Sequence, residues 1–85
     1  MESYKIEITS SAKKEVKRLD LQVIPRIIEK LKILTINPFP AGCKKLIARN
    51  GYRIRVGDYR IIYDVLEKEK VIKIYRIGHR KDIYD

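Results

Sequence analysis

Three arginines whose type and spacing suit phosphate chemistry lie in the segment 51–63, Gly-Tyr-Arg-Ile-Arg-Val-Gly-Asp-Tyr-Arg-Ile-Ile-Tyr. Arg53 and Arg55 alternate with apolar residues, which is the period of a half-buried strand. Gly57-Asp58 fits a two-residue hairpin loop of the Gly-X kind. With that loop Arg55 lies opposite Arg60, and Arg53 shares their side of the sheet. Like charges directly opposite one another weaken a sheet, so the pattern predicts a surface that binds something polyanionic.

The chemistry open to such a cluster is phosphate binding. Guanidinium groups present paired donors in a rigid fork and stay charged. Several of them around one phosphodiester would stabilise the extra negative charge of a pentacoordinate transition state. In RNA the neighbouring 2′-hydroxyl can supply the nucleophile and leave a cyclic phosphate, a reaction that needs no metal. The same pattern also fits a solvated sheet face, so the residues alone indicate a small basic RNA- or DNA-binding domain and leave catalysis open.

The C-terminal segment 77–85 holds the other candidate site residues. We expect Gly78 to break the last strand, so that His79 and Arg80 turn toward the arginine face. Tyr84 would stack on a base or orient a phosphate. Each also has a structural interpretation: His79 as a surface or capping residue, and Tyr84 as a plug over the sheet edge. Because His79 is the single histidine, it argues against a zinc site.

Length and charge define the class of protein. The chain has 85 residues and a formal net charge of +9, from 20 Lys and Arg against 11 Asp and Glu. This length predicts a single domain, residues 1–85. The positive excess favours nucleic acid, an anionic membrane or an acidic protein as partner. No apolar run approaches the roughly 18 residues of a membrane span, and charge interrupts every candidate signal-peptide core. We therefore expect a cytoplasmic protein with no membrane partner.

Motifs for cofactors, metals and protein nucleophiles are missing from the sequence. It has no Gly-rich phosphate loop, no paired-histidine pattern and no serine in a nucleophile turn. A two-metal nuclease needs converging carboxylates, whereas Asp58, Asp64 and Asp82 are scattered and suit loops and surface salt bridges better. Cys43 is alone, which excludes an internal disulfide and suits a reducing compartment. We expect neither a cofactor nor a metal.

The elements that must position these residues follow from periodicity. Alternation over residues 4–8 predicts a strand. N-cap hydroxyls at residues 9–11 precede a helix of about three turns that reaches Leu19. Pro25 fits the first turn of a second helix, which Asn37-Pro38 must end; its apolar stripe consists of Ile24, Ile27, Ile28, Leu31 and Leu34. Strands are expected at 43–48, 52–56, 59–66 and 71–77.

The predicted fold is α+β, in the order β-α-α-β-β-β-β, with a four-stranded antiparallel meander and the helices on one face of the sheet. An even-length loop between the last two strands would pair Ile62 with Tyr75 and Asp64 with Lys73. One face is then apolar and receives the helices; it holds Tyr52, Ile54, Val56, Tyr59, Ile61, Tyr63, Val65, Ile72 and Ile74. The other is expected to be open and cationic; it holds Arg53, Arg55, Arg60, Asp64, Lys73 and Tyr75.

Over nearly its whole length the chain resembles the RelE branch of the RelE/ParE superfamily, the toxins of type II toxin–antitoxin modules. The similarity includes the opening strand ending in Thr-Ser-Ser-Ala-Lys-Lys, the helical hairpin closing on Asn37-Pro38, and Lys45-Leu46. Its more specific parts are the segment 51–63 and the ending Ile77-Gly-His-Arg80 with Tyr84. The resemblance implies the same β-α-α-β-β-β-β fold, and an enzyme that enters the ribosomal A site and cuts the mRNA codon there by metal-independent 2′-hydroxyl attack.

The resemblance also implies roles for individual residues. Arg53 and Arg55 take the basic strand positions, Arg60 grips the scissile phosphate, Arg80 acts on the leaving group, and Tyr84 stacks on the cleaved nucleotide. Relatives have lysines at the strand positions, one of them proposed as general base. Guanidinium groups are poor bases because they do not deprotonate at working pH. The base is therefore open, and His79 becomes a candidate because its ordinary pKa lies near neutrality. Further RNA contacts are expected from Lys44, Lys45, Lys73 and Lys81.

The implied partners are mRNA in the A site, ribosomal RNA, and a RelB-like antitoxin that masks the basic face in a hetero-oligomer. Two alternatives stay open. One is a ParE-like inhibitor of DNA gyrase, which has the same fold and is no nuclease. The other is a basic nucleic-acid-binding module that has lost activity. All three would bind more weakly as salt rises, because phosphate contacts release counterions.

Overall fold

The element order in the computed structural model, which describes residues 3–83, is the predicted one. The chain forms β1 (Lys5–Ile8), α1 (Ser10–Lys17), α2 (Ile24–Ile36), β2 (Lys44–Lys45), β3 (Tyr52–Val56), β4 (Tyr59–Leu66) and β5 (Val71–His79). The α+β class and the single run of strands after the helical hairpin are therefore confirmed.

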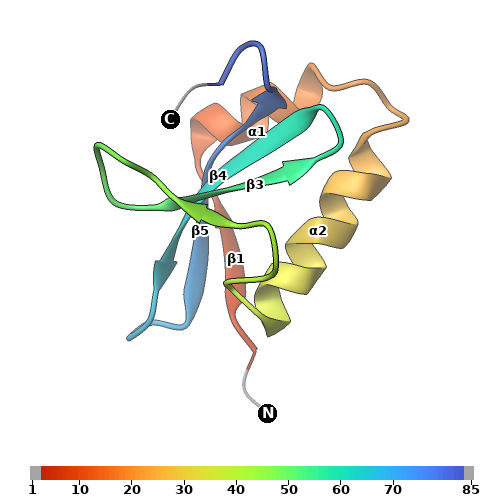
Figure 1. Ribbon diagram of the computed structural model, residues 1–85. Coiled ribbons are helices and arrows are strands. Elements are labelled where there is room, and N and C mark those ends of the chain that lie inside the picture. Colours follow the sequence, from red (N-terminus) through yellow and green to blue (C-terminus); the bar gives the residue numbers. More distant parts are fainter. Residues whose placement is uncertain (1–2, 84–85) are drawn as a thin grey trace.

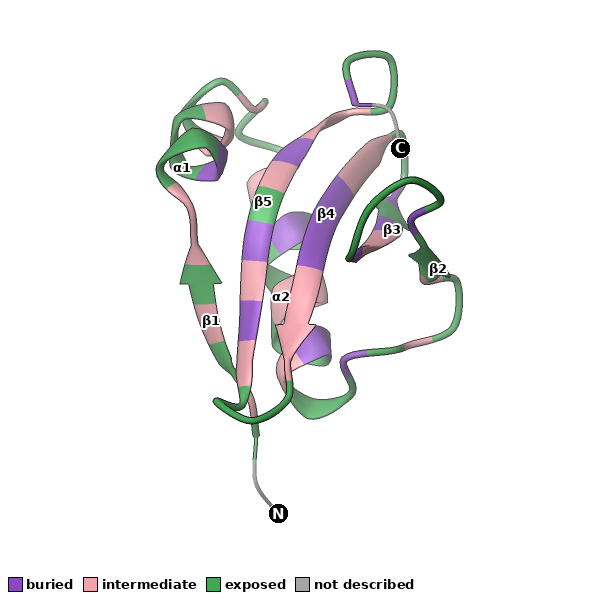
Figure 2. Ribbon diagram, turned by 90° about the vertical axis from the view of Figure 1, so that its left-hand side faces the viewer, coloured by how far each residue is buried: buried purple, intermediate pink, exposed green. Residues whose placement is uncertain are grey.

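The strands form one sheet in the order β1-β5-β4-β3-β2 (Figure 1). β1 runs parallel to β5, and the other neighbours are antiparallel. α2 covers one face of the sheet, and α1 packs beside β5 beyond the point where β1 ends (Figure 2). We refer to the face turned away from α2 as the far face. Figure 2 looks onto it.

Local signals place the ends of the helices. The Thr9 side chain caps α1 by accepting a hydrogen bond from the Ala12 N–H at 3.2 Å. Pro25 lies in the first turn of α2, where a missing N–H has no cost. α2 ends at Ile36, before Asn37-Pro38, as predicted. Two expectations were wrong: α1 is only eight residues long, and Ile28 of the predicted apolar stripe is 46% exposed.

The core lies between α2 and the sheet and consists of the residues predicted for the apolar face. Its fully buried strand members are Ile61, Tyr63, Ile72, Ile74 and Ile77. The Tyr63 hydroxyl donates a hydrogen bond to the Pro38 carbonyl at 2.8 Å. Burial, followed by the contact with Cys43, raises the pKa of Tyr63 far above its ordinary value. This tyrosine therefore anchors the segment after α2 to the sheet as a neutral donor.

The β3–β4 register is the predicted one. Gly57 has a φ of +60°, as the hairpin loop requires, and Arg55 pairs with Arg60. Asp64 pairs with Lys73, which is also as predicted. This part of the sheet follows directly from the turn, because a two-residue loop fixes every cross-strand pair that follows it.

The predicted pairing of Ile62 with Tyr75 was wrong. A bulge shifts the β4–β5 register at this point, so that Ile62 pairs with Arg76 and Tyr63 pairs with Ile74. Tyr75 is the extra residue. A bulge redirects the side chains next to it. Here Tyr75 and Arg76 both come to the far face, and Ile77 turns into the core.

Gly78 does not end the last strand, contrary to expectation. β5 continues through it to His79, and Gly78 pairs with Arg60. A Cβ atom at Gly78 would lie 3.0 Å from the Ile83 Cδ1 atom. The glycine thus makes room for the C-terminal segment to fold back over β5. The strand expected at 43–48 was also too long, since β2 covers Lys44–Lys45 alone.

The far face is not open along its whole length. Leu46, Ile62 and Ile83 form a second buried cluster there. Ile83 is fully buried, and so closes over the centre of the face predicted to be exposed. Within the described part of the chain, no helix is long and apolar enough to cross a membrane.

Candidate nucleic-acid interface

Two rows of cations cross the far face of the sheet. Residues directly opposite one another in antiparallel strands share a face. In one row Arg55 of β3 lies opposite Arg60 of β4. In the other, Lys44 lies opposite Arg53, Arg53 opposite Ile62, and Ile62 opposite Arg76, so that pairing runs from β2 to β5. The structure therefore brings Arg53, Arg55 and Arg60 together, as the sequence predicted, and adds Lys44 and Arg76 to the same face.

The C-terminal segment orients Arg60. The Arg60 Nη1 atom donates a hydrogen bond to the Ile83 carbonyl at 3.1 Å, in a partly buried position. The Ile83 side chain is itself buried against Leu46 and Ile62. Because Ile83 is fixed by packing, its carbonyl holds the guanidinium in one place. Tyr84, the predicted stacking residue, follows in the chain and lies outside the described residues.

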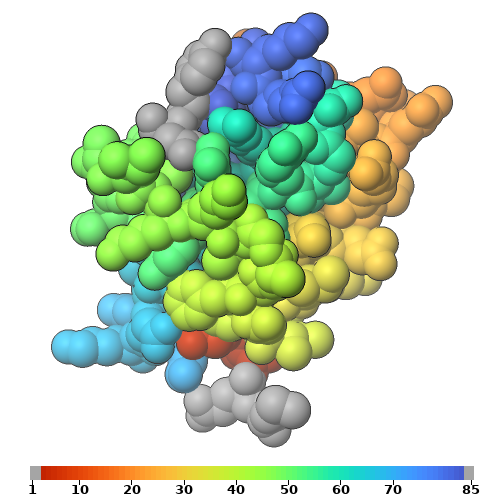
Figure 3. Space-filling model, viewed as in Figure 1, coloured from red at the N-terminus to blue at the C-terminus, as the bar shows by residue number. Residues whose placement is uncertain are grey.

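Arg80 is held at the bend of the β3–β4 hairpin. Its N–H donates to the Asp58 carbonyl at 2.8 Å, and its Nε lies 3.9 Å from the Asp58 Oδ1. The two side chains are 50% and 66% exposed, so the ion pair contributes little to stability. Figure 3 shows the C-terminal segment (blue) against the hairpin (teal). Arg80 therefore lies at the same end of the sheet as Arg55 and Arg60, while Lys81 beside it is exposed.

His79 does not turn toward the arginine face, contrary to expectation. Because β5 continues through Gly78, strand alternation places His79 opposite Tyr59, on the helix side of the sheet. The two rings meet edge to face, with centroids 5.4 Å apart. The His79 Nδ1 atom accepts a hydrogen bond from the Lys81 N–H at 3.1 Å. His79 thus stabilises the turn after β5 and lies on the other side of the sheet from Arg60.

The remaining predicted lysines are separated from one another. Lys45 pairs with Tyr52, whose ring packs against the core, so Lys45 points to the opposite face from Lys44. Lys73 lies on the far face, but toward the other end of the sheet from the Gly57-Asp58 bend. Its Nζ is 3.9 Å from the Glu7 Oε1 and 5.7 Å from the centre of the Tyr75 ring.

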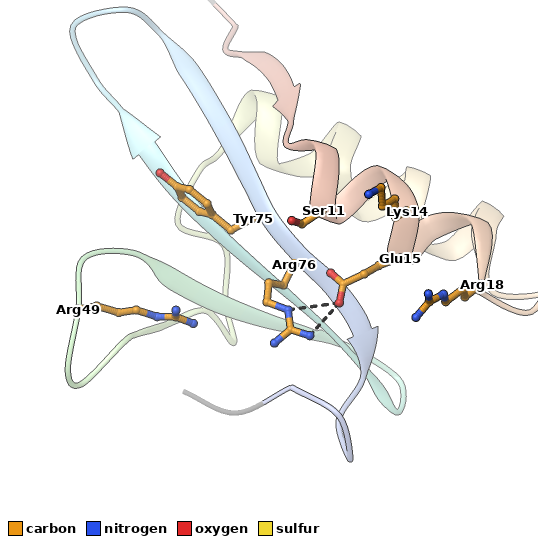
Figure 4. A pocket seen from close by; sticks show the side chains of 7 residues that line it. All are labelled: Ser11, Lys14, Glu15, Arg18, Arg49, Tyr75 and Arg76. Atoms are coloured by element: carbon orange, nitrogen blue, oxygen red, sulfur yellow. Dashed lines mark hydrogen bonds and ion pairs between the residues drawn. The ribbon is translucent and has the colours of Figure 1, made fainter.

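A groove beside the two rows was not predicted. It has a volume of about 510 Å³ and lies between α1 and the loop that joins β2 to β3 (Figure 4). We refer to it as the α1 groove; its lining consists of Ser11, Lys14, Glu15, Arg18, Arg49, Tyr75 and Arg76. Sequence reasoning missed it because the bulge changes which side chains reach the far face. The buried isoleucines of β5 are two residues apart at Ile72 and Ile74 but three residues apart at Ile74 and Ile77. This change of spacing is the sequence signal that could have revealed the bulge, and with it the groove.

Glu15 joins α1 to the edge of β5 inside this groove. Its Oε2 accepts hydrogen bonds from the Arg76 Nη2 at 2.8 Å and the Arg76 Nε at 3.2 Å (Figure 4). Its Oε1 accepts the Ile77 N–H at 3.1 Å. β1 pairs with β5 only as far as Ile74, so the carboxylate supplies the acceptor that a longer neighbouring strand would have provided.

Among residues 3–83 no group of three His, Cys, Asp or Glu side chains is arranged to hold a metal ion. What the far face offers chemically is fixed positive charge. Guanidiniums cannot be deprotonated at working pH, so this surface can bind phosphates and stabilise added negative charge on them.

Comparisons with known proteins show which family this chain resembles. Residues 6–84 match the sequence profile of a family described as the ParE toxin of the type II toxin–antitoxin system parDE. RelE1 of Methanocaldococcus jannaschii, assigned as a toxin, is 29% identical over 85 residues, which is 95% of this chain and 94% of that protein.

Two solved structures extend the comparison. The RelE–RelB complex from Pyrococcus horikoshii contains a chain with a TM-score of 0.77 and 31% identity, covering 94% of this chain and 98% of that one. The RelBE2 toxin–antitoxin complex from Mycobacterium tuberculosis contains one with a TM-score of 0.82 and 22% identity, covering 92% and 99%. At 22% identity the second likeness concerns the fold alone.

Proposed function

Because this chain belongs to the RelE/ParE family of toxins from type II toxin–antitoxin systems, we propose that it is a ribosome-dependent endoribonuclease that cuts mRNA codons in the A site. The observation that carries the proposal is the pairing of Arg55 with Arg60 on the far face. Two guanidiniums directly opposite one another destabilise the sheet, and a bound phosphodiester would offset that repulsion. Inhibition of translation in the cytoplasm would follow from the loss of message.

The proposed chemistry is attack by the 2′-hydroxyl on the adjacent phosphorus. The 2′-oxygen forms a bond to phosphorus, the bond to the 5′-oxygen breaks, and the products are a 2′,3′-cyclic phosphate and a 5′-hydroxyl. Arg60, held by the Ile83 carbonyl, would bind the non-bridging oxygens together with Arg55. Arg80, tied to the hairpin bend, would stabilise the charge that develops on the 5′-oxygen. Removing one such preorganised donor costs roughly 10²–10³ in rate.

The proton of the 2′-hydroxyl needs an acceptor, and the arginines cannot provide it. His79 lies across the sheet from Arg60, so we assign no general base among the described residues. In this proposal the proton passes to solvent, a solvent proton is taken up by the departing 5′-oxygen, and charge stabilisation supplies the acceleration. Tyr84 keeps its predicted role of stacking on the nucleotide beside the cut, with Arg53 and Lys44 holding the flanking phosphates.

We also propose a RelB-like antitoxin as the protein partner. The relatives from Pyrococcus horikoshii and Mycobacterium tuberculosis were solved as complexes with such antitoxins. An acidic segment of the antitoxin would cover the two cationic rows and exclude RNA from them. A disordered acidic segment that folds as it binds suits this task, because it can wrap a large surface.

Inhibition of DNA gyrase is the second candidate, and the match to the ParE profile favours it. The two functions are separated by adding the protein to a translation extract and, in parallel, to gyrase and plasmid DNA. We expect message cleavage in the extract and no trapped gyrase–DNA complex. Trapped gyrase with intact message would refute the nuclease.

The same extract tests the site. Arg60→Ala is expected to lower the cleavage rate by about 10²-fold or more. Lys68→Ala serves as the matched control, because it removes a positive charge from the exposed β4–β5 turn. Equal cleavage by the wild type and Arg60→Ala would refute the proposed phosphate clamp.

A further inference from the structure

We propose that the α1 groove is a second RNA subsite, which binds one nucleotide of a single strand through its phosphate and its base. The groove is separate from the phosphate position assigned to Arg60. Its volume of about 510 Å³ lies within the usual range for small-molecule sites. The assignment rests on the proposed function in one respect: the RNA in the groove would be part of the same RNA strand that is cut.

Charge is the first reason. Lys14 of α1 and Arg18 at its C-cap line one side of the groove, and Arg49 of the β2–β3 loop lines the other (Figure 4). Within residues 3–83 none of these three side chains forms an ion pair. Glu15, the one carboxylate of the lining, is already bound by Arg76 at 2.8 Å. The lining therefore keeps an excess of positive charge, which a phosphate would compensate.

The position of Arg76 is the second reason. The bulge brings it to the far face, in the same cross-strand row as Ile62 and Arg53. The pair with Glu15 uses the Nε and Nη2 atoms, so the guanidinium is held side-on. A fixed guanidinium loses less conformational entropy when it binds phosphate. Arg76 thus links the α1 groove to the row that leads toward the proposed cleavage site.

A platform for a base is the third reason. Tyr75 is the bulge residue and is 38% exposed, although the rest of the alternating pattern in β5 is buried or partly buried. Its ring also borders a smaller cavity of about 120 Å³, shared with Arg49, Asn50 and Ile62. An exposed ring beside an apolar side chain and a guanidinium suits stacking of a nucleobase.

The loop that carries Arg49 is fixed at its base. The Leu46 N–H donates to the Gly51 carbonyl at 3.0 Å, and Leu46 is buried. Gly51 has a φ of +124°, a backbone conformation that residues with side chains rarely adopt.

Cations on two sides of a groove with an aromatic side chain between them form the usual combination for single-stranded nucleic acid. Duplex RNA presents no unstacked base to Tyr75.

The test is binding of a short fluorescein-labelled RNA whose riboses are 2′-O-methylated, so that it cannot be cut. Fluorescence anisotropy over a range of salt gives the dissociation constant and its salt dependence. Arg18→Ala and Arg49→Ala should each reduce the slope of log Kd against log salt by about 0.7, the value for one phosphate contact in a single strand. Lys32→Ala, on the exposed surface of α2, is the matched control and should leave the slope unchanged.

Stacking is tested apart from charge. Tyr75→Leu should weaken binding about fivefold or more without changing the salt slope, and Tyr75→Phe should bind as the wild type does. If the wild type fails to bind the RNA, or Tyr75→Leu binds equally well, the proposal is overturned. It is also overturned if Lys32→Ala lowers the slope as much as Arg49→Ala does. Binding of a poly-glutamate peptide in place of RNA would assign the groove to an acidic protein.

The two proposals fail separately. Groove-dependent RNA binding by a chain that leaves message intact in a translation extract would refute the nuclease and keep the subsite. Cleavage by the wild type, with RNA binding that ignores the groove substitutions, would keep the nuclease and refute the subsite.

Discussion

Glu15 gives the sharpest prediction about stability, because one carboxylate both joins two elements and neutralises a cation. In Glu15→Ala the Ile77 N–H loses its acceptor, which costs about 1–2 kcal/mol for a desolvated donor. The ion pair with Arg76, whose side chain is 41% exposed, adds roughly 0.5–1 kcal/mol. Alanine recovers a few tenths through its higher helix propensity. We expect a net loss of about 2 kcal/mol in the free energy of unfolding.

Two partner substitutions separate these contributions. Glu15→Gln keeps an oxygen for the Ile77 N–H and loses only the charge, so it should cost about 1 kcal/mol. Arg76→Ala removes the ion pair and leaves the Ile77 hydrogen bond in place, so it should cost roughly 0.5–1 kcal/mol. Urea denaturation followed by circular dichroism measures all three. A Glu15→Ala protein no less stable than Arg76→Ala would refute the role given to the Ile77 hydrogen bond.

The substitution Glu15→Gln, which lowers stability, should strengthen RNA binding. Glu15→Gln removes the one carboxylate from the lining of the α1 groove. The groove then gains one net positive charge, and RNA affinity at low salt should rise while stability falls. Weaker RNA binding by a folded Glu15→Gln protein would contradict the charge assignment.

The remaining predictions concern stability at three other places. Gly51→Ala should cost about 2 kcal/mol in urea denaturation, because φ is +124° and a Cβ would lie 3.0 Å from the Tyr63 carbonyl oxygen; wild-type stability would contradict this. Tyr63→Phe should cost about 1–2 kcal/mol near neutral pH through loss of the bond to Pro38. The difference in the free energy of unfolding between the wild type and Tyr63→Phe should shrink by about 1.4 kcal/mol per pH unit above pH 10. The reason is that Tyr63 ionises there in the unfolded wild type, while the raised pKa keeps it neutral in the folded protein. A difference that does not change with pH would contradict the raised pKa. Ile83→Ala should cost about 2 kcal/mol by uncovering Ile62, and an unchanged thermal midpoint would show that the tail is not packed.

Most of the fold was predictable because local rules agree with one another. Thr9, Pro25 and Pro38 mark helix ends by their own chemistry. The Gly57-Asp58 loop fixes the β3–β4 pairing, and with it the face that carries Arg55 and Arg60. These features depend on residues close together in the chain.

What could not be predicted depends on pairing between distant residues. Counting back from the β4–β5 turn gives the correct register only until the bulge at Tyr75, and the turn carries no information about that extra residue. Gly78 indicated a strand break, yet its missing side chain makes space for Ile83. Because β5 continues through Gly78, its side chains keep alternating between the two faces, and this alternation places His79 on the helix side. The parallel pairing of β1 with β5 is likewise set by tertiary packing.

These differences change the site more than the fold. The bulge adds Arg76 to the far face, and the continued strand moves His79 away from it. Both shifts favour a mechanism based on fixed charge over one based on a titrating base.

Mapping of 5′-hydroxyl ends on bacterial transcripts, after induction of the wild type and of Arg60→Ala, tests the central claim most directly. If the far-face arginines cut messages on the ribosome, new ends should appear within translated regions at a fixed position in the codon. They should be lost in Arg60→Ala and persist in Lys68→Ala. New ends that are equally abundant with Arg60→Ala, or that occur equally in untranslated RNA, would contradict it.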